Sequence, residues 1–244
     1  MDSDFKGKRA LVTGAGQGIG RDVTIALANR GAKVTAISKT EESLRALKEE
    51  IPDVATICLD LSDWNATKRV LKELGPIDLL VNNAGYSILG AFQDVTEEDF
   101  DKVFGINVKG LLNVSQEVSR GMMERKTGGA IVNVSSVASS VAFQNHVSYC
   151  ASKGAVDQIT KVMALELGPH KIRVNAVNPT VVMTAMGKMA WSDEVKAKPV
   201  LDRIPLGRFA EVKDVVDPIL FLLSDKSAMI NGACLPIEGG YLAN

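Results

Sequence analysis

The 244-residue sequence predicts an α/β fold of one domain, a doubly wound parallel sheet of about seven strands with helices on both faces. Short apolar, β-branched segments alternate with longer segments of helical periodicity along the whole chain. No linker, repeat or low-complexity run interrupts this alternation, and the hydrophobic content of 46% is ordinary for a globular domain. We therefore expect residues 1–244 to form a single domain.

The first strand and the turn after it predict a dinucleotide site. Residues 9–13 run directly into Thr13-Gly14-Ala15-Gly16-Gln17-Gly18-Ile19-Gly20, after which apolar residues recur at helical spacing. Glycines let the backbone turn tightly and approach a pyrophosphate, whose charge is met by free N–H groups at the helix N-terminus. An ordinary tight strand-to-helix connection is the alternative. The expected cofactor-binding residues here are Gly14, Gln17, Gly18, Ile19 and Gly20.

The second strand, expected over residues 33–38, ends where a dinucleotide fold selects its cofactor. An acidic residue at this point would hydrogen-bond the ribose 2′-hydroxyl of NAD, but the chain reads Ser38-Lys39-Thr40. Hydroxyls and a lysine suit a 2′-phosphate, so NADP (NADPH when reduced) is favoured over NAD. A solvated charge at the strand end is the alternative interpretation of Lys39. The following acids, Glu41 and Glu42, are interpreted as complements to the next helix dipole.

Two further strands end in short polar segments. The strand expected over residues 54–59 leads into Asp60-Leu61, and the strand over residues 79–81 leads into Asn82-Asn83-Ala84-Gly85. Ligands bind beyond the carboxyl ends of strands in open α/β sheets. We therefore expect Asp60 and Leu61 beside the adenine, although an ordinary turn role suits Asp60 equally well. The small residues Ala84 and Gly85 allow close backbone approach to the cofactor, and the amides of Asn82 and Asn83 can brace neighbouring strands.

A helix is expected over about residues 97–123, with Thr96 as its N-cap and Asn107 in its interior. Asparagine is unfavourable in the middle of a helix. A buried amide that holds a water or the catalytic lysine would explain Asn107, and a merely tolerated polar residue is the alternative.

The stretch from Ala130 to Lys153 predicts acid–base chemistry. Residues 130–134 form a buried strand that ends at Ser135 and Ser136, and Tyr149 and Lys153 follow four residues apart in a helix-forming run, so they share one helix face. A phenol titrates at about pH 10 unless a neighbouring cation stabilises its phenolate, as Lys153 would. Ser136 can hydrogen-bond a substrate oxygen. A solvated helix face is the alternative for an isolated Tyr-x-x-x-Lys.

The last part of the chain completes the fold. The helix from about residue 149 to 168 is apolar on more than one face and is expected to be buried, against another subunit or in a thicker core. A sixth strand is expected over residues 173–177, followed by Asn178-Pro179 and a lid over about residues 180–205 with weak periodicity. A helix over residues 212–223 and a strand over residues 234–237 follow.

Composition and charge argue against several classes of function. A formal net charge of −1 gives no attraction to nucleic acid or anionic membranes, and no apolar run approaches the roughly 18 residues of a membrane span. Cys58, Cys150 and Cys234 are far apart, which indicates neither a disulfide framework nor a metal site. The N-terminal residues lack the pattern of a secretory signal, so a cytoplasmic protein is expected.

Several motifs in this order and spacing resemble the short-chain dehydrogenase/reductase family over essentially the whole chain. They are Thr13-Gly14-x-x-x-Gly18-x-Gly20, Asn82-Asn83-Ala84-Gly85, Asn107, Ser136 and Tyr149-x-x-x-Lys153. The resemblance implies a Rossmann fold in which Tyr149 exchanges a proton with the substrate oxygen. It further implies that Lys153 lowers the tyrosine pKa and holds the nicotinamide ribose, that Ser136 positions the carbonyl, and that Asn107 supports a proton-relay water.

A narrower resemblance lies in residues 144–146, 165–175, 178–184 and 191–193. These segments resemble tetrameric, NADPH-dependent members of the family that reduce ketoses and α-dicarbonyls. That resemblance implies a substrate pocket lined by Asn145, His146 and Trp191, and a nicotinamide amide held by Pro179, Val182 and Thr184. The chain departs from many NADPH-using relatives at Gln17, where they carry a basic residue, which leaves Lys39 as the main expected partner of the 2′-phosphate.

The predicted function is an NADPH-dependent carbonyl reductase for a ketose or dicarbonyl substrate. A broad xenobiotic ketone reductase is an alternative of the same class. A module that senses NADP and does little chemistry is an alternative of another class, against which the full set of Ser136, Tyr149 and Lys153 argues.

Overall fold

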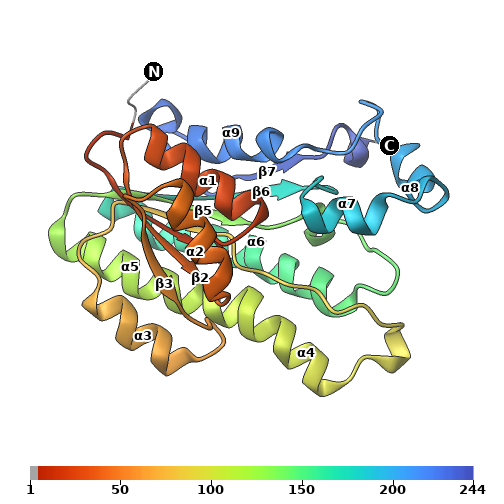
Figure 1. The fold of residues 1–244 in the computed structure, drawn as a ribbon, viewed down its shortest axis with the longest axis horizontal. Helices are drawn as coiled ribbons and strands as arrows, with labels where there is room; N and C mark the ends of the chain where they lie inside the picture. Colours follow the sequence, from red (N-terminus) through yellow and green to blue (C-terminus); the bar gives the residue numbers. More distant parts are fainter. Residues whose placement is uncertain (1–4, 244) are drawn as a thin grey trace.

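The computed structural model describes residues 5–243 and contains one sheet of seven parallel strands (Figure 1). The strand order is β3-β2-β1-β4-β5-β6-β7, so the direction of winding reverses between β1 and β4. The predicted doubly wound Rossmann fold is confirmed. The strands are β1 (Arg9–Thr13), β2 (Lys33–Ser38), β3 (Ala55–Cys58), β4 (Leu79–Asn82), β5 (Gly129–Val134), β6 (Ile172–Pro179) and β7 (Cys234–Ile237).

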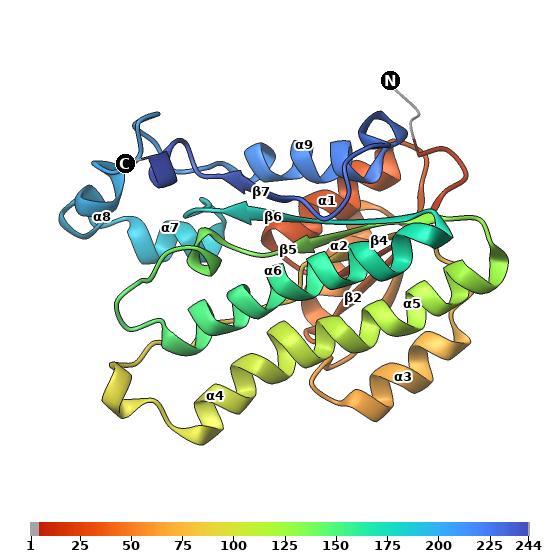
Figure 2. The same ribbon diagram turned by 180° about the vertical axis from the view of Figure 1, so that it is seen from behind.

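Helices cover both faces of the sheet (Figures 1 and 2). One face carries α1 (Gly18–Asn29), α2 (Glu41–Glu50) and α9 (Val212–Leu223). The other carries α3 (Trp64–Glu73), α5 (Leu111–Arg125) and α6 (Val147–Leu167). The remaining helices are α4 (Glu97–Phe104), α7 (Ala185–Trp191) and α8 (Glu194–Leu201).

Alternate residues of each strand enter the two hydrophobic cores. In β1, Val12 packs with Leu27 of α1 and Ile219 of α9, whereas Leu11 packs on the other face with Met122 of α5. Because both faces are covered, the central strands β1, β4 and β5 are almost entirely buried and mainly apolar.

Buried amides connect the central strands. Asn82 Nδ2 donates to Asn133 Oδ1 at 2.9 Å and to Ser115 Oγ at 2.9 Å, and Asn133 Nδ2 donates to Thr160 Oγ1 at 2.8 Å. Asn82 and Asn133 are register partners in β4 and β5. A buried amide is costly unless it is paired, so these bonds favour one register and fix α5 and α6 against it.

The predicted helix over residues 97–123 contains a π-helical turn, η2 (Gly105–Gly110), between α4 and α5. Its N-cap is Thr96, as predicted, with Oγ1 accepting from the Asp99 N–H at 3.1 Å. Asn107 lies in the π turn, a distortion that occurs most often at functional sites.

The lid segment contains the two short helices α7 and α8, which lie beyond the carboxyl ends of the strands (Figure 2). It is built around a small core of its own, here called the lid cluster, which consists of the buried Ala197, Ile204, Phe209 and Tyr241. Phe143, from the loop before α6, packs against this cluster. The lid therefore connects the loop before α6 to the C-terminal segment.

In the second half of the chain, the bounds of one strand differ from expectation, and one of the two alternatives for α6 is excluded. Strand β6 begins at Ile172 and includes Asn178 and Pro179, which were expected to follow the strand. Helix α6 is not buried all round, because Val162 is 44% and Leu165 is 78% exposed. A thicker core therefore does not explain these two residues. Among residues 5–243, no helix is both long and apolar enough to cross a lipid bilayer.

Candidate functional site

Ser136 lies just beyond the carboxyl end of β5. Its backbone is extended, and the turn η3 (Val137–Ser139) follows it. The hydroxyl accepts from the Ala138 N–H at 3.1 Å and donates to the Pro179 carbonyl at 3.4 Å. The second bond is long and therefore weak, so the hydroxyl proton can turn towards a substrate oxygen at little cost.

Tyr149 and Lys153 lie one turn apart on α6, as predicted. The Lys153 Nζ is 5.5 Å from the centre of the Tyr149 ring and donates to the Val134 carbonyl at 2.9 Å. The Ser136 hydroxyl also lies close enough to the Tyr149 phenol to lower the phenol's pKa. The structure thus brings the predicted hydroxyl, phenol and ammonium together at one end of the sheet.

The pKa of Tyr149 lies above its ordinary value, and not below it as predicted. Burial raises the pKa of the phenol, and Ser136 offsets only part of that rise. Burial also lowers the pKa of Lys153 to about 8, although Asp157 acts in the opposite direction. Near neutral pH the phenol therefore holds its proton and Lys153 is charged, which suits a group that donates a proton to a carbonyl oxygen.

Asn107 fixes the loop after β4 to helix α6. Its Oδ1 accepts from the Tyr86 N–H at 2.8 Å, and its Nδ2 donates to the Tyr86 carbonyl at 3.0 Å and to Ser152 Oγ at 2.9 Å. The hydrogen bonds of Asn107 go to Tyr86 and Ser152 and not to Lys153, so the alternative in which this amide holds the lysine is not supported. Its role towards a water stays a prediction.

The glycine turn between β1 and α1 leaves no room for side chains. A Cβ on Gly20 would lie 2.4 Å from the Gly14 carbonyl oxygen and 2.4 Å from Asn83 Nδ2. Gly14 and Gly18 have φ of +63° and +55°, which glycine adopts readily. Gln17 precedes the helix without capping it through its side chain, so the first N–H groups of α1 stay available to an anion.

The loop after β4 is braced against this turn. Asn83 Nδ2 donates to the carbonyl oxygens of Thr13 and Gly14, both at 3.1 Å, and Thr13 Oγ1 accepts from the N–H groups of Asn83 and Ala84. The predicted bracing role of Asn83 is confirmed. A Cβ on Gly85 would lie 3.4 Å from Lys153 Nζ, so this loop also reaches the catalytic lysine.

The lid reaches the glycine turn through Thr184. A Cβ on Gly18 would lie 3.1 Å from the Thr184 Cγ2. Thr184 caps α7 by accepting from the Gly187 N–H at 3.0 Å. Val182 pairs with Ala210 next to the end of β6, whose last residue is Pro179. The segments expected to hold the two ends of a dinucleotide therefore surround one cradle, which fits the cofactor.

At the end of β2, the Lys39 ammonium lies 2.7 Å from Asp60 Oδ2. Asp60 Oδ1 accepts from the Ser62 N–H at 3.0 Å and from the Ser62 hydroxyl at 2.7 Å, which is the turn role considered for it. Burial raises the pKa of Asp60, but Lys39 and Ser62 outweigh burial and hold it below the usual value. Lys39 therefore forms an ion pair, but its side chain is 71% exposed, so it is also the solvated strand-end charge of the alternative interpretation. Beside this pair, Leu61 is buried, Ser38 is half-buried and Thr40 is exposed at the N-cap of α2.

The predicted substrate residues lie in two places. Asn145 has a φ of +65°, and its carbonyl accepts from the Gly90 N–H at 3.0 Å. The His146 Nδ1 lies 2.7 Å from the Gln144 carbonyl oxygen, and the ring centre is 6.2 Å from that of Tyr149. Trp191 instead packs 5.7 Å from Phe209 in the lid cluster.

Two residues that sequence reasoning missed, Phe143 and Tyr241, support this side of the site. Their rings stack with centres 6.1 Å apart, and Arg203 donates to the Tyr241 hydroxyl at 2.8 Å. No motif marks them, because their partnership is created only when the C-terminal segment folds back onto the lid.

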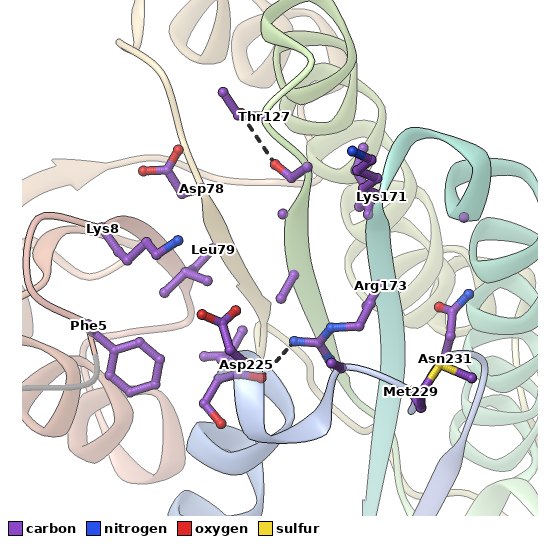
Figure 3. A pocket seen from close by; sticks show the side chains of 18 residues that line it. Phe5, Lys8, Asp78, Leu79, Thr127, Lys171, Arg173, Asp225, Met229 and Asn231 are labelled. Atoms are coloured by element: carbon purple, nitrogen blue, oxygen red, sulfur yellow. Dashed lines mark hydrogen bonds between the residues drawn. The ribbon is translucent and has the colours of Figure 1, made fainter. Parts of the chain in front are cut away.

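A cavity of about 610 Å³ lies at the opposite edge of the sheet, at the amino ends of β4, β5 and β6 (Figure 3). Arg173 points into this region, but it donates to the carbonyls of Leu222 and Ser224 and to the Ser227 hydroxyl. The guanidinium thus caps the C-terminal end of α9, so its N–H groups are not available to a ligand.

Comparisons with known proteins agree with this geometry. Residues 14–242 match the protein family described as enoyl-(acyl carrier protein) reductase. L-xylulose reductase of Mesocricetus auratus is 59% identical over 242 residues, which cover 99% of each chain. Carbonyl reductase [NADPH] 2 of Sus scrofa is 51% identical over 244 residues, which cover 100% of each chain.

A solved structure described as a putative NAD(P)-dependent gluconate 5-dehydrogenase from Beutenbergia cavernae, with bound NADP, superposes with a TM-score of 0.95. It is 32% identical, and the match covers 100% of both chains. Full-length similarity in sequence and fold, together with the Ser136, Tyr149 and Lys153 arrangement at the carboxyl end of the sheet, shows that this chain belongs to the short-chain dehydrogenase/reductase family.

Proposed function

We propose that this chain is an NADPH-dependent carbonyl reductase that reduces L-xylulose to xylitol and also reduces α-dicarbonyls such as diacetyl. The observation that carries the proposal is the convergence of Ser136, Tyr149 and Lys153 in a chain that is 59% identical to an L-xylulose reductase. The relative named for NADPH and the neighbour with bound NADP support the cofactor.

The cofactor would lie along the carboxyl edge of the sheet. The glycine turn and the N-terminus of α1 would hold the pyrophosphate, Lys39 the 2′-phosphate, and the lid with Lys153 the nicotinamide end. When bound, NADPH supplies the hydride that adds to the carbonyl carbon. The full proposed set is Gly14, Gln17, Gly18, Ile19, Gly20, Ser38, Lys39, Thr40, Asp60, Leu61, Asn83, Ala84, Gly85, Tyr149, Lys153, Pro179, Val182 and Thr184.

The protein's own part in the reaction is the transfer of one proton. Ser136 donates a hydrogen bond to the carbonyl oxygen and holds it beside Tyr149. Tyr149 gives its proton to the same oxygen as negative charge develops there, and Lys153 stabilises the phenolate that is left. Solvent then returns a proton to Tyr149, and Asn107 is proposed to support the water that carries it. The ketone gains a hydride and a proton and becomes an alcohol.

The substrate would be bound between the catalytic residues and the lid. Asn145, His146 and Trp191 are the proposed pocket residues. His146 is favoured as a partner for a sugar hydroxyl, because its ring lies beside that of Tyr149 and its Nδ1 is already engaged by Gln144.

A broad ketone reductase is the second candidate, and the similarity to the Sus scrofa carbonyl reductase favours it. Aromatic and aliphatic side chains around the lid cluster would suit apolar ketones as well as sugars. The ratio of kcat/KM for L-xylulose to kcat/KM for apolar ketones decides between the two candidates.

The decisive test follows the loss of NADPH absorbance with purified protein and either L-xylulose or diacetyl. Turnover is expected in the wild type and a loss of at least about a thousandfold in Tyr149→Phe, because the proton donor is removed. Absence of turnover with both substrates would refute the reductase, and NADP binding without turnover would favour a sensing module. Full activity of Tyr149→Phe would refute the assigned acid.

We also propose a homotetramer in the cytoplasm. The exposed apolar residues Val162 and Leu165 on α6 offer surface for another subunit. Light scattering of the purified protein measures the subunit number, and cell fractionation locates it. A monomer whose mass does not change with concentration would contradict the assembly.

A further inference from the structure

We propose that Asp157 is a positioning residue for the reaction, one that keeps Lys153 charged and fixes the turn that carries Ser136. The inference rests on the proposed function, because it concerns the same catalytic lysine. It starts from the location of Asp157, one helical turn beyond Lys153 on α6.

Tyr149, Lys153 and Asp157 follow one another at intervals of four residues, so their side chains form one stripe along α6. Lys153 lies in the middle of this stripe and is only 4% exposed. A buried ammonium is expensive unless an opposite charge is near. The carbonyl of Val134, which accepts its hydrogen bond, brings no net charge. Asp157 brings one.

Asp157 is itself held in place by a buried amide. Asn178 Nδ2 donates to Asp157 Oδ2 at 2.8 Å, and Asn178 is only 3% exposed. The same amide lies 2.9 Å from Ser139 Oγ and 3.2 Å from the Ser136 carbonyl oxygen. Through Asn178, the carboxylate is therefore connected to both ends of the turn that presents the Ser136 hydroxyl.

The other oxygen of the carboxylate, Oδ1, is buried from solvent. Among the described residues, no donor lies at a distance and angle suitable for a hydrogen bond to it. Its surroundings contain three titratable groups: Lys153 and Lys161 on α6, and Cys234 on β7. Burial, the charge of Asp157 and a hydrogen bond with Asp157 together raise the pKa of the Cys234 thiol to about 11, against the effect of Lys161. The charge of Asp157 likewise opposes the lowering of the Lys153 pKa by burial.

The first test is the pH profile of Asp157→Asn, which keeps the shape of the side chain and removes its charge. The pKa of Lys153, and with it the alkaline limb of kcat/KM for ketone reduction, should move down by about one pH unit. The reason is that a nearby opposite charge shifts a pKa by about that much. Relative to wild type, the rate should fall about tenfold at pH 9 and less than twofold at pH 6. A purely structural role would lower the rate equally at both pH values, and an unmoved limb would overturn the proposal.

Lys161→Gln is the matched control. It removes a charge from the exposed side of the same helix, beyond Asp157, and should leave the alkaline limb in place. If it moves the limb as far as Asp157→Asn does, the effect comes from the general charge of the helix, and Asp157 has no special role.

The second test needs no turnover, so it separates this inference from the proposed function. Thermal melts at pH 7 are compared for wild type, Asp157→Asn, Lys153→Met and the double variant. If Asp157 stabilises the charged lysine, Lys153→Met should raise Tm more in the Asp157→Asn background than in wild type. If the Tm changes of the two substitutions are additive, the inference is overturned even if the enzyme is active. If the Tm changes are coupled but the protein shows no turnover, only the proposed function is refuted.

Discussion

Replacing Lys39 by Asp should reverse much of the preference for NADPH over NADH. Lys39 directly follows β2 at the predicted 2′-phosphate position, and Gln17 offers no second cation there. A carboxylate would repel the phosphate of NADPH but accept a hydrogen bond from the ribose hydroxyl of NADH.

The magnitude follows from the exposure of the site. Two unit charges about 4 Å apart interact by about 1 kcal/mol in water and about 4 kcal/mol near a protein surface. Lys39 is 71% exposed and must share its charge with Asp60, a pair worth no more than about 1 kcal/mol, so the low end applies. Losing the attraction between Lys39 and the 2′-phosphate, and gaining repulsion from the new carboxylate, should then sum to about 2 kcal/mol. This corresponds to about a thirtyfold fall in the ratio of kcat/KM for NADPH to kcat/KM for NADH.

The assay measures kcat/KM with both cofactors at saturating ketone and at low ionic strength. Lys33→Asp is the matched control, because Lys33 is exposed at the amino end of the same strand and the charge change is identical. Asp60→Asn should modestly raise the ratio of kcat/KM for NADPH to kcat/KM for NADH, because Lys39 loses its ion-pair partner. A ratio that stays within twofold of wild type in Lys39→Asp would refute the role of this lysine.

Three further outcomes concern stability. Lys153→Met should abolish turnover yet stabilise the fold at pH 7 by up to about 3 kcal/mol. The reason is that the folded pKa of Lys153 is lowered to about 8, so wild-type stability rises only as pH passes from about 8 towards 10.5. Gly20→Ala should destabilise by about 1–3 kcal/mol, because its Cβ meets the Gly14 carbonyl oxygen. Asp78→Asn should cost about 1–3 kcal/mol at pH 7, since Asp78 accepts three hydrogen bonds from Arg9.

Urea denaturation at several pH values checks all three. A stabilisation by Lys153→Met that stays constant up to pH 10.5 would contradict its electrostatic origin. Gly75→Ala is the control for Gly20→Ala, because a Cβ on Gly75 meets nothing within 4 Å, and equal losses would exclude the steric cause. For Asp78, burial raises the pKa but Arg9 and Arg125 outweigh it and hold the pKa low, so the stabilisation is present above about pH 4 and fades in acid. A difference that persists at pH 2 would contradict this account.

The centre of the sheet was predictable because β1, β4 and β5 are buried on both faces and are mainly apolar. The glycine turn and the four-residue spacing of Tyr149 and Lys153 encode local geometry directly, so the structure brings these residues together as expected. The sequence carries no local signal for the π turn at Asn107. The reason is that Asn107 is held by hydrogen bonds with Tyr86 and Ser152, which are distant in sequence.

Contacts and burial that only the folded chain creates explain the other differences. The pairing of Lys39 with Asp60 joins the ends of two strands, and nothing at either position announces it. The raised pKa of Tyr149 results from burial, which a short motif does not reveal. The helices of the lid were missed because their apolar residues pack in a cluster with Tyr241, near the C-terminus, so the local periodicity is weak.

The lid cluster has no buried residue in common with the two cores that hold the sheet. A substitution in it reshapes the mouth of the site but opens no void beside β1 or β5, where it would threaten folding. Acceptance of new carbonyl compounds and retention of a stable scaffold are thus separable traits in this protein. A laboratory evolution campaign directed at the lid can diversify substrates while the proton-donating machinery is inherited intact.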